Sequence, residues 1–225
     1  LLLCNAEIFS VQGKALNEVA NPNVKVLVTG NPANTNALIA MKNAPDLSPF
    51  CFSAMMQLDH NRSISQVAEK AGVTSREISN VVVWGNHSST QFPDLHHAKI
   101  KEEDALSIVG EDWFKDDFIP TVQQRGGAII KARGQSSAAS AASAAISHMN
   151  TWIFGTEEND WMSMGMVSDG SYGIEKGLMF SFPVTVVKGY VNIVQDLKLN
   201  DFSKEKLLVT EAELKEERDA IKHLF

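Results

Sequence analysis

The chain has 225 residues, a net charge of -7, 44% hydrophobic residues and 21% charged residues. This length allows one large domain or two small ones, and the composition is typical of a soluble globular protein. The negative charge argues against a nucleic-acid partner, and no apolar run approaches the ~20 residues that a helix needs to span a membrane.

The first 55 residues have the pattern of a doubly wound α/β sheet. Residues 6–19 predict a helix, 24–28 predict a strand buried on both faces, and a second helix is expected to begin near Asn34. The turn Gly30-Asn31-Pro32 follows the strand, at the sheet edge where such folds bind ligands, although an ordinary strand-to-helix turn has the same pattern.

From about Met55 the pattern changes to a mixed α+β region that runs to the end of the chain, and we assign residues 56–225 to it. A capping-box pattern, Thr210-Glu211-Ala212-Glu213, predicts the start of the final helix. Lys188-Gly189 predicts a hairpin turn between two strands. The remaining predicted elements are helices over 59–71, 118–133 and 136–150, and strands over 81–84, 161–167, 178–187 and 190–194.

Three residues have the side chains for proton transfer on an anionic substrate. Two lie at the start of the 59–71 helix, and the third follows the 81–84 strand. Asp59 and Arg62 are three residues apart and share a helix face. A helix followed by a strand reverses the chain, so His87, just past the strand, can return beside Asp59. A carboxylate orients an imidazole that exchanges protons, and a guanidinium binds a substrate carboxylate. A structural ion pair and a packed histidine are the alternative interpretation.

Two other chemistries are weaker interpretations. Asp94, His96 and His97 could suggest a metal, but neighbouring histidines point in different directions and no third ligand has suitable spacing, so we predict no metal site. A hydrolase built on Ser88 or Ser89 would need a strained Gly-x-Ser-x-Gly turn, which is absent from the sequence.

Several blocks in the same order resemble malate dehydrogenase, in the branch that includes the cytosolic and chloroplast enzymes. They are Leu58-Asp59-His60-Asn61-Arg62, Trp84-Gly85-Asn86-His87-Ser88-Ser89-Thr90-Gln91, Thr29-Gly30-Asn31-Pro32-Ala33-Asn34-Thr35-Asn36, Val122-Gln123-Gln124-Arg125-Gly126-Gly127, Ser163-Met164-Gly165 and Ser168-Asp169-Gly170. The resemblance implies that residues 1–55 are the C-terminal portion of a Rossmann-type NAD-binding domain and that 56–225 form an α+β substrate-binding and catalytic domain.

The resemblance also implies the reaction, the NAD-dependent, reversible oxidation of malate to oxaloacetate. His87 would take the hydroxyl proton, Asp59 would orient His87, and Arg62 would bind the carboxylate beside the reacting carbon. Asn31 would contact both substrate and cofactor, and a hydroxyl at a helix start, Ser136 with Ser137 as its close competitor, would face the substrate. The cofactor residues implied in full are Asn5, Gln12, Thr29, Gly30 and Asn31.

The glycine-rich phosphate turn and the acidic ribose-binding residue of a dinucleotide fold are not in this sequence, and the family's substrate-binding arginine loop would fall just before Leu1. We therefore expect the sequence to begin inside a longer protein and to hold half of a cofactor site. A non-catalytic truncated fragment and a lactate-type dehydrogenase remain as alternatives, and NADP remains as an alternative cofactor.

The resemblance further implies a homodimer in which the helix around Asp59 lies near the partner subunit. Cys4 and Cys51 have neither metal-ligand nor redox spacing, so we expect reduced thiols and a cytoplasmic protein.

Overall fold

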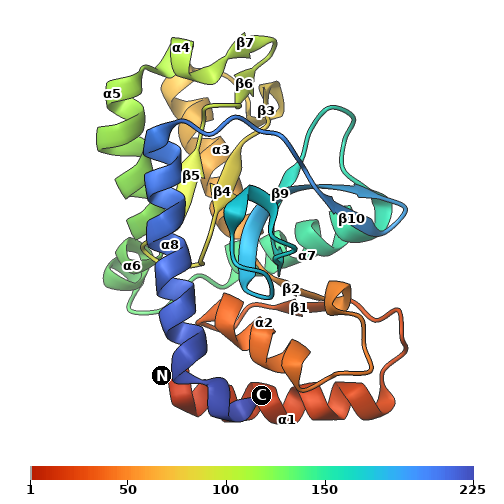
Figure 1. Cartoon of the computed structure of the whole chain (residues 1–225). Helices are drawn as coiled ribbons and strands as arrows, with labels where there is room; N and C mark the ends of the chain where they lie inside the picture. Colours follow the sequence, from red (N-terminus) through yellow and green to blue (C-terminus); the bar gives the residue numbers. More distant parts are fainter. Residues whose placement is uncertain (1) are drawn as a thin grey trace.

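A mixed five-stranded sheet forms the centre of the computed structural model, which describes residues 2–225, with side chains from Asn5 onward (Figure 1). Its strands, in spatial order, are β1 (Val26–Val28), β2 (Phe52–Ala54), β8 (Met162–Val167), β9 (Met179–Val187) and β10 (Tyr190–Ile193). β1 and β2 run parallel, as in a doubly wound sheet, whereas the pairs from β2 to β10 are antiparallel. The predicted α/β fold is confirmed.

Two helices cover the parallel end of this sheet. α1 (Leu2–Val19) and α2 (Ala33–Lys42) pack against each other, and α2 contributes much of a small core with β1 and β2. β1, which lies between these two helices in the sequence, is short. The three residues after it, Thr29, Gly30 and Asn31, are exposed at its carboxyl end.

The second part of the chain is built around α3 (Gln57–Ala71), which follows β2 directly and ends before Gly72 as predicted. The hairpin of β4 (Val82–Trp84) and β5 (Phe92–Asp94) packs between β9 and α6 (Ile119–Arg133). The other strands and α-helices are β3 (Ile78–Ser79), β6 (Lys99–Ile100), β7 (Glu103–Asp104), α4 (Ala105–Val109), α5 (Glu111–Trp113), α7 (Ala139–Phe154) and α8 (Asp201–Ala220). A π-helical stretch (Phe114–Phe118) joins α5 to α6, and short 3₁₀ turns lie at Pro49–Cys51, Ser75–Glu77, Ser171–Gly173 and Lys222–Leu224.

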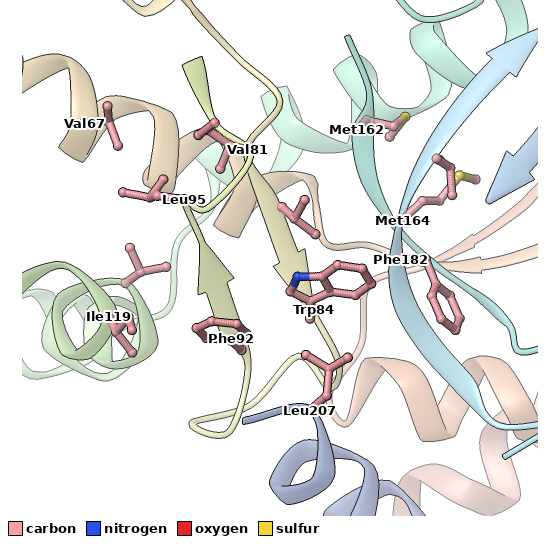
Figure 2. Packing of buried hydrophobic residues seen from close by; sticks show 14 of the residues in the cluster. Val67, Val81, Trp84, Phe92, Leu95, Ile119, Met162, Met164, Phe182 and Leu207 are labelled. Carbon is pink, nitrogen blue, oxygen red and sulfur yellow. The ribbon is translucent and has the colours of Figure 1, made fainter. Parts of the chain in front are cut away.

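A large apolar core joins this part of the molecule. Figure 2 shows Trp84 of β4 between Phe92 of β5 and Phe182 of β9, with Leu207 of α8 beneath it. Trp84 is fully buried, and its ring nitrogen donates a hydrogen bond of 3.1 Å to Asp94 Oδ2. Because Trp84 is the last residue of β4, its close packing in the core fixes where the loop after β4 begins.

Most predicted elements are confirmed to within a few residues, but the start of the final helix is wrong. α8 begins at Asp201, where the Asn200 side chain accepts a hydrogen bond of 2.8 Å from the Ser203 amide. Thr210 and Glu213 lie in the middle of α8 and bind the loop after β4, so their capping-box spacing has another cause. The helix predicted from Ser136 also begins later, at Ala139.

None of the helices in the part of the chain that the structure describes is both long and apolar enough to cross a bilayer.

Two histidines are buried as neutral side chains, and both should make the fold sensitive to acid. Burial lowers the pKa of His60 to about 4 and that of His148 to about 3. Between pH 6.5 and those values the unfolded chain binds protons that the folded chain does not, so stability falls as the pH falls. Each histidine should cost roughly 2 kcal/mol of unfolding free energy on going from pH 7 to pH 5.

Urea unfolding at the two pH values measures this cost. In a His148→Gln variant, which keeps a polar group facing Ser53 but does not titrate, the loss between pH 7 and pH 5 should shrink by His148's share. His223→Gln, at an exposed position, should leave the loss as in the wild type. An equal loss in all three proteins would contradict the assignment.

Candidate active site

Asp59 and Arg62 project from the first turns of α3. The Asp59 side chain is buried, with 1% of its surface exposed, and Arg62 Nη1 lies 3.2 Å from Asp59 Oδ1. The second guanidinium nitrogen of Arg62 donates a hydrogen bond of 3.3 Å to Ser137 Oγ. Arg62 is therefore oriented from both sides while part of its side chain stays accessible.

His87 lies just beyond β4 and returns to Asp59. Its Nδ1 is 2.6 Å from Asp59 Oδ2, and neither atom has another hydrogen-bonding partner among the described residues. Because Nδ1 faces a carboxylate, the imidazole proton belongs on Nδ1, which leaves Nε2 free to accept a proton. The pattern of a helix, a strand and a histidine thus brings together the groups that the sequence pointed to.

The pair is electrostatically coupled. Burial by itself raises the pKa of Asp59, but His87, and more weakly Arg62, hold that pKa below its usual range. Burial lowers the pKa of His87 and Arg62 lowers it further, yet Asp59 prevails and the pKa of His87 lies above its ordinary value. The carboxylate therefore stays ionised at neutral pH, and its charge favours the protonated form of the His87 imidazole.

Gln91, which sequence reasoning did not single out, gives Asp59 a further partner. Its Nε2 donates a hydrogen bond of 3.3 Å to Asp59 Oδ1. Gln123 of α6 donates a hydrogen bond of 2.7 Å to the Gln91 carbonyl oxygen. The position of Gln91 in the Trp84–Gln91 block was a signal, but a glutamine in a loop carries no chemistry of its own.

These side chains face a cavity of about 920 Å³, within the range of small-molecule sites. Its lining comes from the end of β1, from α3, from the loop after β4, from α6 and from the segment before α7. The polar lining residues that matter for the chemistry are Thr29, Asn31, Asp59, Arg62, His87, Gln91, Ser136 and Ser137.

Of the five residues expected at the cofactor, Thr29 and Asn31 line the cavity. Asn5 supports this turn from α1, because its side-chain amide donates a hydrogen bond of 2.6 Å to the Asn31 carbonyl oxygen. Gly30 accepts a hydrogen bond of 2.8 Å from Asn36 and is not among the lining residues. Gln12 is exposed on α1 and is not among the lining residues.

Ser136 and Ser137 both line the cavity, in a segment that precedes α7 rather than at the helix start. Ser137 is the one that contacts Arg62. The sequence alone could not separate these two adjacent hydroxyls, because the irregular backbone before α7 decides which of them turns toward α3.

The Asp94 and His96 side chains form a separate hydrogen-bonded pair, with 2.5 Å between Asp94 Oδ1 and His96 Nδ1. No group of three candidate ligands with metal-binding geometry occurs in residues 2–225 as described. Ser88 donates a hydrogen bond to Glu213 instead of facing the free nitrogen of His87, which disfavours a serine nucleophile.

The nicotinamide end of a dinucleotide fits the residues present. Thr29 and Asn31 offer hydroxyl and amide groups at the open carboxyl end of β1, and they share one cavity with His87. Thr29 and Asn31 would hold the nicotinamide in this cavity, which His87 and Arg62 also line, and the ring would supply the hydride acceptor.

Comparison with known proteins places both parts of the chain in one family. Residues 56–225 match the α/β C-terminal domain of lactate/malate dehydrogenases, and residues 1–49 match the NAD-binding domain of the same family. The predicted cofactor, NAD, and the predicted combination of an NAD-binding portion with an α+β domain agree with these matches.

Solved structures extend the likeness over the whole chain. A malate dehydrogenase from Naegleria fowleri is 47% identical with a TM-score of 0.94, over 98% of this chain and 68% of the other. A lactate dehydrogenase from Trichomonas vaginalis, solved with NADH and oxamate, is 38% identical with a TM-score of 0.96, over 100% of this chain and 70% of the other. A malate dehydrogenase from Salinibacter ruber, at 21% identity and a TM-score of 0.86, shares the fold over 100% of this chain and 72% of its own. The chain belongs to the lactate/malate dehydrogenase family.

Proposed function

We propose that this chain carries the substrate-binding and proton-transfer part of an NAD-dependent malate dehydrogenase. The observation that carries the proposal is the 2.6 Å contact between His87 Nδ1 and Asp59 Oδ2, with Arg62 beside it on a cavity that reaches the end of β1. The choice of malate is supported by the quoted motif blocks and by 47% identity to the Naegleria malate dehydrogenase, against 38% to the Trichomonas lactate dehydrogenase.

In the proposed reaction the residues of this chain bind the acid and move one proton. Arg62 pairs with the carboxylate next to the reacting carbon and fixes the orientation of the substrate. Nε2 of His87 accepts the hydroxyl proton during oxidation and returns it during reduction, while Asp59 stabilises the imidazolium. Asn31 donates a hydrogen bond near the reacting oxygen. NAD, when bound, supplies the hydride acceptor.

The domain division and the assembly are part of this proposal. Residues 1–55 belong to the nucleotide-binding domain, and residues 56–225 form the substrate-binding domain. The protein forms a homodimer with α3 near the partner subunit, which sedimentation of the purified protein would test. Ser136 and Ser137 face the substrate, with Ser137 also positioning Arg62.

Substrate preference tests the proposal in the protein as its gene encodes it. With NADH, kcat/KM for oxaloacetate should exceed that for pyruvate by about a hundredfold or more. A site that selects oxaloacetate pairs its second carboxylate, and pyruvate lacks that group. The same assay with NADPH identifies the preferred cofactor.

A preference for pyruvate would instead establish the lactate-type reaction, a candidate that the Trichomonas likeness favours. No turnover of either acid by a folded protein would contradict both and support the non-catalytic fragment.

A further inference from the structure

The middle of α8 binds the loop that carries His87, although 120 or more residues separate the two along the chain. Glu213 Oε2 accepts three hydrogen bonds, from Asn86 Nδ2 at 2.8 Å, from Ser88 Oγ at 2.5 Å and from Thr90 Oγ1 at 2.5 Å. One turn earlier, Thr210 Oγ1 accepts the Asn86 amide at 2.8 Å. The residues on both sides of His87 are therefore bound to one carboxylate.

This carboxylate has no charge partner within the described part of the chain. Neither Glu213 nor Glu217, one turn further along α8, forms an ion pair there. Both carboxylates accept a hydrogen bond from the side-chain amide of Asn86. Like charges at this spacing destabilise a helix. Burial and the neighbouring Glu213 raise the pKa of Glu217. Helix stability does not account for a carboxylate at position 213, whereas the three hydrogen bonds to the loop do.

The opposite side of His87 is fixed by α2. The His87 amide donates a hydrogen bond of 2.9 Å to Asn34 Oδ1, and Asn34 Nδ2 donates one of 3.1 Å to the Gly85 carbonyl oxygen. With Asn34 on one side and Glu213 on the other, the backbone of His87 is held between two helices.

The loop also lies too close to α8 for its position to vary. Gly85 has a φ of +91°, and a Cβ at this residue would come within 2.2 Å of Thr210 Cγ2. Only glycine permits this approach, which brings the loop within reach of the short Glu213 side chain. In Figure 1, α8 passes directly alongside the strands of this region.

We infer that Glu213 is a positioning residue for proton transfer, because its carboxylate fixes the loop that keeps His87 in contact with Asp59. The inference deepens the proposed function and rests on it. A loop released from α8 would let His87 leave the 2.6 Å contact, and the imidazole would then lose both its fixed tautomer and its stabilised charge.

The first test follows the titration of His87 by NMR, with the signal assigned from a His87→Gln sample. In Glu213→Ala the pKa of His87 should fall by about one unit, because contact with Asp59 is lost part of the time. Glu213→Gln removes the charge but keeps an acceptor oxygen, so it should show less than half of that shift. Glu216→Ala, an exposed glutamate on the same helix turn, should titrate as the wild type does.

Kinetics give the second readout. Glu213→Ala should lower kcat about tenfold or more while changing the KM for NADH less than about threefold, since the loop acts on the proton-transfer step. Glu213→Gln should recover most of the loss, and Glu216→Ala should match the wild type.

Three results would overturn the inference. One is a lower melting temperature in Glu213→Ala with an unchanged His87 pKa, which would make the residue structural only. Another is a shift in Glu213→Gln as large as in Glu213→Ala, which would assign the effect to charge alone. If Glu213→Ala does not fold, Ser88→Ala takes its place, since it removes one of the three donors to Glu213. The third overturning result is an unchanged titration of His87 in that variant.

The NMR arm needs no substrate, so the two ideas can fail separately. A wild-type protein that turns over neither acid contradicts the proposed function but leaves the titration readable. Unchanged titration in an active enzyme contradicts the role of Glu213 and leaves the dehydrogenase assignment intact.

Discussion

Replacing His87 with glutamine is expected to lower turnover about a thousandfold or more while the affinity for NADH changes little. General acid–base catalysis by a positioned side chain typically contributes about 10² to 10⁴ in rate, and glutamine cannot accept a proton at neutral pH. The backbone amide of His87 remains bound to Asn34 in this variant, so the loop should keep its course. Loss of rate would then reflect the missing imidazole.

Single-turnover kinetics and a fluorescence titration with NADH, made on the same preparation, separate the two effects. His223→Gln, at an exposed histidine near the end of the chain, is the matched control and should retain wild-type kinetics. Turnover by His87→Gln within a factor of about ten of the wild type would remove His87 from the proton-transfer role.

Replacing Asp59 with asparagine should lower kcat by about 10² to 10⁴ and also move its pH dependence. The amide can present its NH₂ group to Nδ1, which favours the tautomer with the proton on Nε2, the nitrogen that has to accept one. Asp59 also raises the pKa of His87, so its removal should lower that pKa.

The sign of the shift follows from which form of His87 is needed. Alcohol oxidation requires the neutral imidazole, so the wild-type rate rises as the pH passes upward through the pKa of His87. In Asp59→Asn that rise should occur at lower pH. Keto-acid reduction requires the imidazolium, so its rate falls as the pH rises, and this fall should also move to lower pH. Steady-state rates in both directions between pH 5 and pH 9 measure the shift. A profile that keeps its midpoint, or moves to higher pH, would separate Asp59 from the ionisation of His87.

Local sequence patterns predicted the part of the site that depends on neighbouring elements. The helix containing Asp59 and the strand before His87 were predicted nearly to the residue, because period, β-branched content and a terminal glycine all agree there. Since a helix followed by a strand reverses the chain, the meeting of Asp59 with His87 could be inferred without coordinates.

Contacts between distant segments could not be inferred in this way. The amides that support the site, Asn34 and Gln91, have no distinctive spacing, and Glu213 lies 125 residues from Ser88. Thr210, three residues before Glu213, gave a false capping signal, because the same polar spacing serves either a helix end or a tertiary contact. The short strands β2 and β5 were also missed, since three residues carry too little periodicity to identify a strand.

The central sheet joins the two regions that the family models match. β2 pairs with β1 on one side and with β8 on the other, and it leads directly into α3. At the second junction, a Cβ on Gly165 would lie 2.7 Å from Ala54 Cβ, so the backbones are in direct contact. The exposed end of β1 and the first turn of α3 thus both extend from neighbouring strands of one sheet. The position of Asn31 relative to Asp59 is therefore set by the pairing of β1 with β2, because Asn31 follows β1 and Asp59 lies in the helix that follows β2.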